Sequence, residues 1–195
     1  MKLQGKILLG YGLSLALVVV VGGWGISNLR RLGRASDAIL KENYNSILAA
    51  ENLIDAIERQ DSAILLFLLE NSDLGSEQFQ QNQIEFLKWL GKAEGNITIA
   101  GEEEIIASME QSYQDYLTAF DRLKRQSNPT TEDYYQTILP LFEEIRANSV
   151  RLRLINQETM EAASEEAQQI SSQAVISMAL ALLIAAGIGL GFSLL

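Results

Sequence analysis

Hydrophobic and polar positions divide the chain into three parts. Residues 7–26 and 174–195 contain no charged side chain, whereas residues 27–173 mix apolar, charged and amide positions throughout. At about 1.5 Å of rise per residue, a helix of about 20 residues matches the roughly 30 Å hydrocarbon layer of a bilayer. We therefore expect 7–26 and 174–195 to be transmembrane helices, with residues 1–6 as a cytoplasmic N-terminus and 27–173 as an external domain.

Each apolar stretch also has an alternative interpretation. The first follows Lys2 and Lys6 as the core of a secretory signal would, but it exceeds the usual length of about 7 to 15 residues and no Ala-x-Ala cleavage site follows it. The second could be a buried core helix, but its apolar residues are continuous instead of lying on one face. Trp24 suits a membrane interface, and we predict that both stretches are retained spans.

The charge distribution favours an external, acidic domain. Residues 27–173 hold all 25 acidic residues and every basic residue except Lys2 and Lys6. These two lysines favour a cytoplasmic N-terminus, whereas the three arginines at 30–34 favour the opposite orientation. Length decides, because loops longer than about 60 residues are translocated largely regardless of charge. An acidic domain is poorly suited to nucleic acid or an anionic membrane face.

Turn-forming residues divide the external domain into helical segments. Gly, Asn, Ser and Asp cluster at 71–76, 95–101 and 126–129. Thr130, followed by acidic residues, suits the N-cap of the last segment. The predicted helices span about 28–72, 76–96, 101–126 and 131–173.

The segments carry apolar residues at alternating spacings of three and four, which is typical of helices that pack side by side in a bundle. The third segment is clearest, with Ile106, Met109, Tyr113, Tyr116, Phe120 and Leu123. The second carries Phe79, Gln83, Phe86, Leu90, Ala93 and Ile97. The fold class we expect is all-α: two transmembrane helices flanking an antiparallel up-down four-helix bundle, with outer helices 1 and 4 continuous with the spans.

Two asparagines interrupt the apolar rows of the outer helices at matching heights. Asn43 lies 17 residues after the first apolar stretch and Asn156 lies 18 residues before the second. Both should therefore stand about 25 Å above the bilayer and could face one another. Each is either a polar residue that sets helix register or a ligand contact. As a register residue, Asn156 replaced by Leu should strengthen the bundle.

The middle helices are too short to reach the membrane. Below about Ala49 and Arg151 only the two outer helices remain, and two helices cannot cover each other's apolar rows. A second copy of the chain would complete a four-helix stalk there, so we predict a homodimer.

A second candidate site lies higher in the bundle, near Pro140. This residue removes one helical hydrogen bond and stands level with Asp61. Arg59 and Arg146 are predicted to lie near the same level. These residues are either a signal-binding site or solvated charges beside a kink.

Three segments carry a resemblance to a known family. They are ENYNSILAAE at 42–51, continuing to AIERQDSA at 56–63, then NITIAGE at 96–102 and INQETM at 155–160. The chain resembles the N-terminal sensor region of KinB-type bacterial sensor histidine kinases and of related four-helix-bundle chemoreceptors. The resemblance implies an inner-membrane receptor whose periplasmic bundle detects a ligand or protein. It also implies that helix motion passes through the second span to a HAMP relay and an output domain.

The chain itself carries no catalytic chemistry that we recognise. It has no histidine, no nucleotide-binding loop and no metal-ligand set, so we expect no cofactor, no metal and no enzymatic activity of its own. A response regulator would be a partner only through a kinase portion that follows residue 195. Two alternatives stay open: the input end of a methyl-accepting chemotaxis receptor, or a stand-alone two-span protein that pairs through Gly187, Gly189 and Gly191.

Overall fold

The protein is all-helical over the residues that the computed structural model describes, 3–69 and 72–194, and no strand occurs in them. The elements follow in this order: α1 (Leu3–Leu69), α2 (Ser72–Glu94), α3 (Glu102–Arg125), α4 (Thr131–Asp133), the π-helical turn η1 (Tyr134–Ile138) and α5 (Leu139–Leu194). They form two compact units, one of residues 41–160 and one that combines 1–40 with 161–195.

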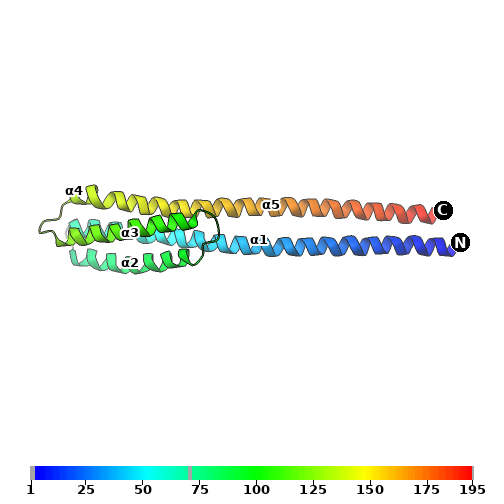
Figure 1. The fold of residues 1–195 in the computed structure, drawn as a ribbon, viewed down its shortest axis with the longest axis horizontal. Helices are drawn as coiled ribbons and strands as arrows, with labels where there is room; N and C mark the ends of the chain where they lie inside the picture. The colour runs from blue at the N-terminus through cyan, green and yellow to red at the C-terminus, as the bar shows by residue number, and fades with distance from the viewer. Residues whose placement is uncertain (1–2, 70–71, 195) are drawn as a thin grey trace. The chain divides into compact units, whose positions relative to one another are not determined.

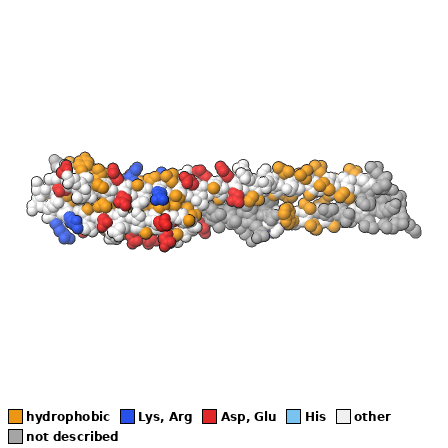
Figure 2. Space-filling view, turned by 45° about the horizontal axis from the view of Figure 1, so that its top comes forward, with side chains coloured by type: hydrophobic (Ala, Val, Ile, Leu, Met, Phe, Trp, Pro, Cys, Tyr) orange, Lys and Arg blue, Asp and Glu red, His pale blue; other side chains and the backbone are white. Residues whose placement is uncertain are grey.

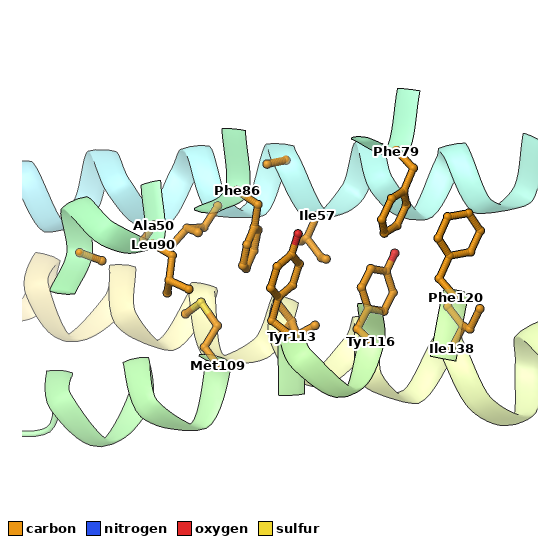
Figure 3. Close-up of a cluster of buried hydrophobic side chains, with 14 of the residues drawn as sticks. Ala50, Ile57, Phe79, Phe86, Leu90, Met109, Tyr113, Tyr116, Phe120 and Ile138 are labelled. Carbon is orange, nitrogen blue, oxygen red and sulfur yellow. The ribbon is translucent and has the colours of Figure 1, made fainter. Parts of the chain in front are cut away.

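The unit of residues 41–160 is built from helices that lie side by side around one core. The second half of α1 packs with α2, α3 and the first part of α5 (Figure 1). Aromatic rings pack together at the centre: Phe86 and Tyr113 are stacked with ring centroids 3.9 Å apart, and Phe79 and Phe120 are tilted with ring centroids 4.2 Å apart (Figure 3). Such ring pairs contribute stability beyond the area they bury.

The predicted apolar row of the third helix is confirmed. All six of its members are at most 4% exposed: Ile106, Met109, Tyr113, Tyr116, Phe120 and Leu123. The row of the second helix holds for four buried positions, namely Phe79, Phe86, Leu90 and Ala93. It fails at Ile97, which is 43% exposed because α2 has already ended at Glu94.

The turn predicted at 71–76 is shorter than expected, because α2 already begins at Ser72. Gly75 is therefore a buried residue inside α2. A Cβ atom at this position would lie 2.6 Å from the backbone nitrogen of Phe67 and 2.7 Å from the carbonyl oxygen of Ala63. Glycine is required here by close helix approach and not by turn conformation.

The chain enters α5 through a capped and widened turn. The hydroxyl of Thr130 accepts a hydrogen bond from the Asp133 backbone N–H, and the Asp133 carboxylate accepts one from the Thr130 backbone N–H. This reciprocal pair confirms Thr130 as the N-cap. The π-helical residues 134–138 come directly before Leu139 and Pro140. Since proline clashes with the carbonyl four residues earlier, a wider turn at this point relieves the clash.

The other unit contains the apolar segments. One continuous helical stretch of the described residues, Thr131–Ile188, contains a window long and apolar enough to cross a membrane, and almost none of that window is buried. Exposed hydrophobic side chains recur from Ile170 to Leu190 of α5, and Figure 2 shows the acidic side chains gathered away from the hydrophobic ones at that end.

The predicted first span is described only in part. The side chains of residues 6–9, 13–14 and 17 lie outside the described residues. The described part contains a shorter apolar helix, Val18–Ser27, with Trp24 61% exposed. The described residues therefore give one candidate span where the sequence predicts two. The stalk residues 34–40, where a second copy was expected to pack, also lie outside the described side chains.

Candidate functional site

The two predicted asparagines are both buried in the unit of residues 41–160. Asn43 is 1% exposed and Asn156 is 0% exposed. Asn156 Nδ2 donates to Glu102 Oε1 at 2.8 Å and to the Leu152 carbonyl at 2.9 Å. Among the described residues, Asn43 Nδ2 and Asn156 Oδ1 have no hydrogen-bond partner. No hydrogen bond joins the two asparagines in this part of the chain.

Glu102, which accepts the Asn156 hydrogen bond, is a site residue that the sequence did not indicate. It lies in the first turn of α3, and its side chain is 1% exposed. Glu102 Oε2 accepts backbone N–H bonds from Thr98 at 2.6 Å and Ile99 at 3.0 Å. Three donors thus compensate one buried carboxylate. Its position directly after Gly101, whose φ is +95°, lets the chain turn back toward that carboxylate.

Asn96 attaches the same loop to α1. Its Nδ2 donates at 2.8 Å to both the Glu42 carbonyl and the Ser46 hydroxyl. Ser46 is itself 1% exposed. The loop between α2 and α3 is therefore hydrogen-bonded to α1 through Asn96. It is also connected to α5, because Glu102 at the start of α3 accepts bonds both from the loop and from Asn156. We call Asn43, Asn96, Glu102 and Asn156 the asparagine cluster.

Asp61 makes its side-chain hydrogen bond to a tyrosine and not to either of the arginines predicted near it. Asp61 Oδ1 accepts a hydrogen bond of 2.8 Å from the hydroxyl of Tyr134 in η1. Partial burial raises the pKa of the Asp61 carboxyl, and the Tyr134 hydrogen bond opposes that shift. In the neighbouring core, the Tyr113 hydroxyl donates to Gln60 Oε1 at 3.0 Å. The Tyr116 hydroxyl is buried without a partner among the described residues.

Arg59 and Arg146 form separate surface ion pairs. Arg59 Nε lies 2.9 Å from Asp55 Oδ2 on the same helix, and both side chains are more than 60% exposed. Arg146 Nε lies 2.8 Å from Glu58 Oε1 and links α5 to α1. Exposed pairs of this kind contribute little stability. Within the described residues, no hydrogen bond or ion pair joins Arg59, Asp61 and Arg146 to one another.

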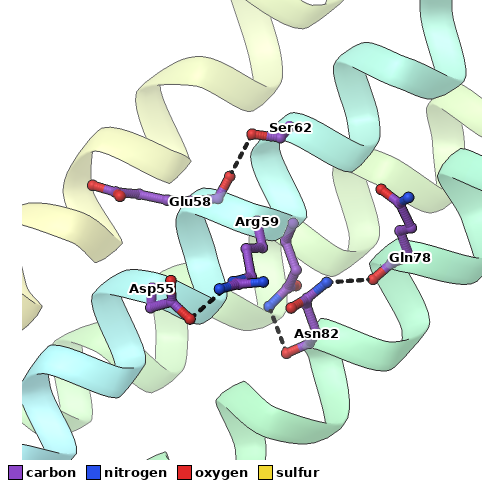
Figure 4. Close-up of polar contacts among 7 residues, drawn as sticks. Asp55, Glu58, Arg59, Ser62, Gln78 and Asn82 are labelled. Carbon is purple, nitrogen blue, oxygen red and sulfur yellow. Dashed lines mark hydrogen bonds and ion pairs between the residues drawn. The ribbon is translucent and has the colours of Figure 1, made fainter.

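Arg59 instead lines a polar hollow between α1 and α2, which we call the α1–α2 groove. The hollow measures about 460 Å³. Side chains from both helices extend into the same space (Figure 4). The lining comprises Asn52, Asp55, Ala56, Arg59 and Ser62 of α1 with Gln78, Gln81, Asn82, Glu85 and Trp89 of α2. On both helices the lining residues recur at spacings of three and four, and this shared spacing is the signal for the groove that the sequence contains.

Comparison with known protein families, curated proteins and solved structures finds no match to this chain. No group of three or more metal-ligating side chains occurs among the residues that the structure describes. The asparagine cluster, the Asp61 contact and the α1–α2 groove are thus the candidate sites.

Proposed function

We propose that the chain is the input module of a bacterial transmembrane signalling receptor, with a two-component sensor histidine kinase as the receptor class. In this proposal residues 27–173 form an antiparallel four-helix bundle outside the inner membrane, residues 7–26 and 174–195 cross it, and the receptor is a homodimer. The alternative output is that of a chemotaxis receptor.

The observation that supports the proposal most is the continuity of two helices. α1 is unbroken from Leu3 to Leu69, and α5 is unbroken from Leu139 to Leu194. Each helix therefore includes both core residues of the 41–160 unit and apolar residues of the other unit. Pro140 is the only proline in either helix and lies at the beginning of α5. A small slide or rotation of either helix can be transmitted along its length.

Contact between the apolar parts of the two helices also supports paired spans. Gly25 of α1 is buried, and a Cβ atom there would lie 2.6 Å from Met178 Sδ of α5. Small residues permit such close approach between membrane helices.

A chimaeric receptor tests this function. The whole chain would be joined after residue 195 to the HAMP and kinase portion of a receptor with a measurable output. We expect Asn43→Leu, which alters the buried asparagine cluster, to change basal kinase output. The control Gln80→Ala, at an exposed position of α2, should leave it unchanged.

Ala167→Pro should break α5 between the sensor and the output and remove the effect of Asn43→Leu. If kinase output is the same with and without Asn43→Leu in the unbroken chimaera, the sensory role is wrong.

A further inference from the structure

We propose that the α1–α2 groove binds a small neutral polyhydroxy ligand, a sugar or polyol. The biological meaning of this inference rests on the proposed sensory role, because the ligand would be the signal. The choice of ligand chemistry rests on the groove alone.

The groove exists because its polar side chains bond within their own helices. Arg59 is paired with Asp55, and Asn52 Nδ2 donates to the Leu48 carbonyl at 2.7 Å. On the facing helix, Asn82 Nδ2 donates to the Gln78 carbonyl at 2.7 Å. No hydrogen bond between two side chains of the lining crosses from α1 to α2 among the described residues. The two polar rows therefore face a hollow instead of closing it.

The charged groups of the lining are already compensated. Asp55 lies against Arg59, and Glu85 Oε2 lies 2.8 Å from Lys88 Nζ. An anionic or cationic ligand would have to displace one of these internal partners. A neutral ligand avoids that cost and can still bond to the outer lone pairs and N–H groups of the same side chains.

The unused hydrogen-bonding capacity of the groove belongs to amides. The side chains of Gln78 and Gln81 line the hollow, and neither has a partner among the described residues. An amide offers an acceptor oxygen beside two donor hydrogens, and a hydroxyl group both donates and accepts. Several adjacent hydroxyl groups are therefore the chemistry that matches this lining.

Trp89 supplies the apolar element that a sugar ring also needs. Its indole is half-buried at the groove and makes a cation–π contact with the Lys92 ammonium, whose Nζ lies 3.6 Å from the ring centroid. A pyranose has an apolar C–H face and a polar rim, which correspond to the indole and the amide rows. The volume of about 460 Å³ lies within the range of about 300 to 1,000 Å³ usual for small-molecule sites.

Tryptophan fluorescence gives a direct test on the full chain in detergent. The protein has two tryptophans, so Trp24→Phe leaves Trp89 as the sole reporter. The probes are glucose, galactose, maltose and glycerol, and the comparators that carry charged groups are glycine, a zwitterion, and glutamate, an anion. We expect a saturable change in Trp89 emission with at least one of the four neutral probes and none with the charged pair.

Neighbouring glutamines provide a matched pair of variants. Gln81→Ala removes an amide of the groove lining, whereas Gln80→Ala removes an amide outside the groove, and both positions are exposed. Gln81→Ala should raise the Kd about tenfold, which corresponds to about 1.4 kcal/mol. Gln80→Ala should leave the Kd unchanged, and circular dichroism should show both variants folded.

No saturable response to any neutral probe, a response confined to glycine or glutamate, or equal losses in the two variants would overturn the inference. Binding in purified protein and kinase output in the chimaera are separate measurements, so either proposal can fail without the other.

Discussion

The hydroxyl of Tyr134 donates a 2.8 Å hydrogen bond to Oδ1 of Asp61 and thereby joins the π-helical turn to α1. Asp61 is partly buried, and burial raises the pKa of its carboxyl above the usual value of 3.8. The folded protein therefore binds a proton at Asp61 more tightly than the unfolded chain does. As pH falls through the raised pKa toward the usual value, this residue's contribution to the free energy of unfolding increases.

Asp61→Asn should stabilise the protein at pH 7, because the amide oxygen keeps the Tyr134 bond and no charge is desolvated. We expect a gain of about 1 kcal/mol in the free energy of unfolding. The gain should shrink as the pH is lowered through the raised pKa and the wild-type carboxyl becomes protonated. Denaturant unfolding across that range measures it, with Asp55→Asn at an exposed site as control. A gain that does not depend on pH would contradict the assignment.

Two core tyrosines should differ in how the free energy of unfolding responds when their hydroxyls are removed. Tyr116→Phe removes a buried hydroxyl without a partner and should be neutral or stabilising, whereas Tyr113→Phe leaves Gln60 Oε1 without its donor. We expect Tyr113→Phe to cost about 1 kcal/mol. Thermal unfolding of the pair gives the comparison, and an equal loss in both variants would show that the Tyr116 hydroxyl is bonded in solution.

Gly75 and Gly91 provide a matched test of helix packing within α2. Gly75→Ala should cost about 1 to 3 kcal/mol, because its Cβ would overlap the backbone of α1. Gly91→Ala has open space around its Cβ and should stabilise the helix by up to about 1 kcal/mol. Midpoints of urea unfolding distinguish the two. Similar effects at both positions would mean that α2 does not approach α1 as closely as described.

The contacts of the asparagine cluster change the stability expected of the Asn156→Leu variant. Asn156→Leu would deprive the buried Glu102 carboxylate of a donor, so we now expect a loss of about 1 to 3 kcal/mol instead of a gain. Asn43→Leu removes a buried donor that has no partner and should be neutral or stabilising. Calorimetric unfolding of both variants tests this difference. A more stable Asn156→Leu variant would return Asn156 to a purely register-setting role.

Periodicity predicted the helices and much of the core because burial in a bundle repeats at fixed steps. The buried apolar row from Ile106 to Leu123 could therefore be predicted from residue spacing alone. The sequence places Gly75 in a turn because a glycine required by close packing looks the same in sequence as one required by backbone conformation.

The candidate sites were less predictable than the helices. Arg59 pairs with Asp55 and not with Asp61, since the direction of an exposed side chain depends on its immediate neighbours. Nothing in the sequence distinguishes Glu102 from other acidic residues in the first turn of a helix, because its burial depends on how the preceding loop folds onto it. The groove requires that α1 and α2 pack in a particular register, and the residue pattern of one helix does not specify that register.

The central claim is that residues 27–173 lie outside the membrane and that the segments before and after them, 7–26 and 174–195, each cross it. The chain has no cysteine, so Ser127→Cys in the loop before α4 and Gln4→Cys near the N-terminus each introduce a single thiol. In cells with a permeabilised outer envelope and an intact inner membrane, a membrane-impermeant maleimide should label Ser127→Cys at once. It should label Gln4→Cys only after lysis. Labelling of Gln4→Cys in intact cells with protection of Ser127→Cys would contradict the account.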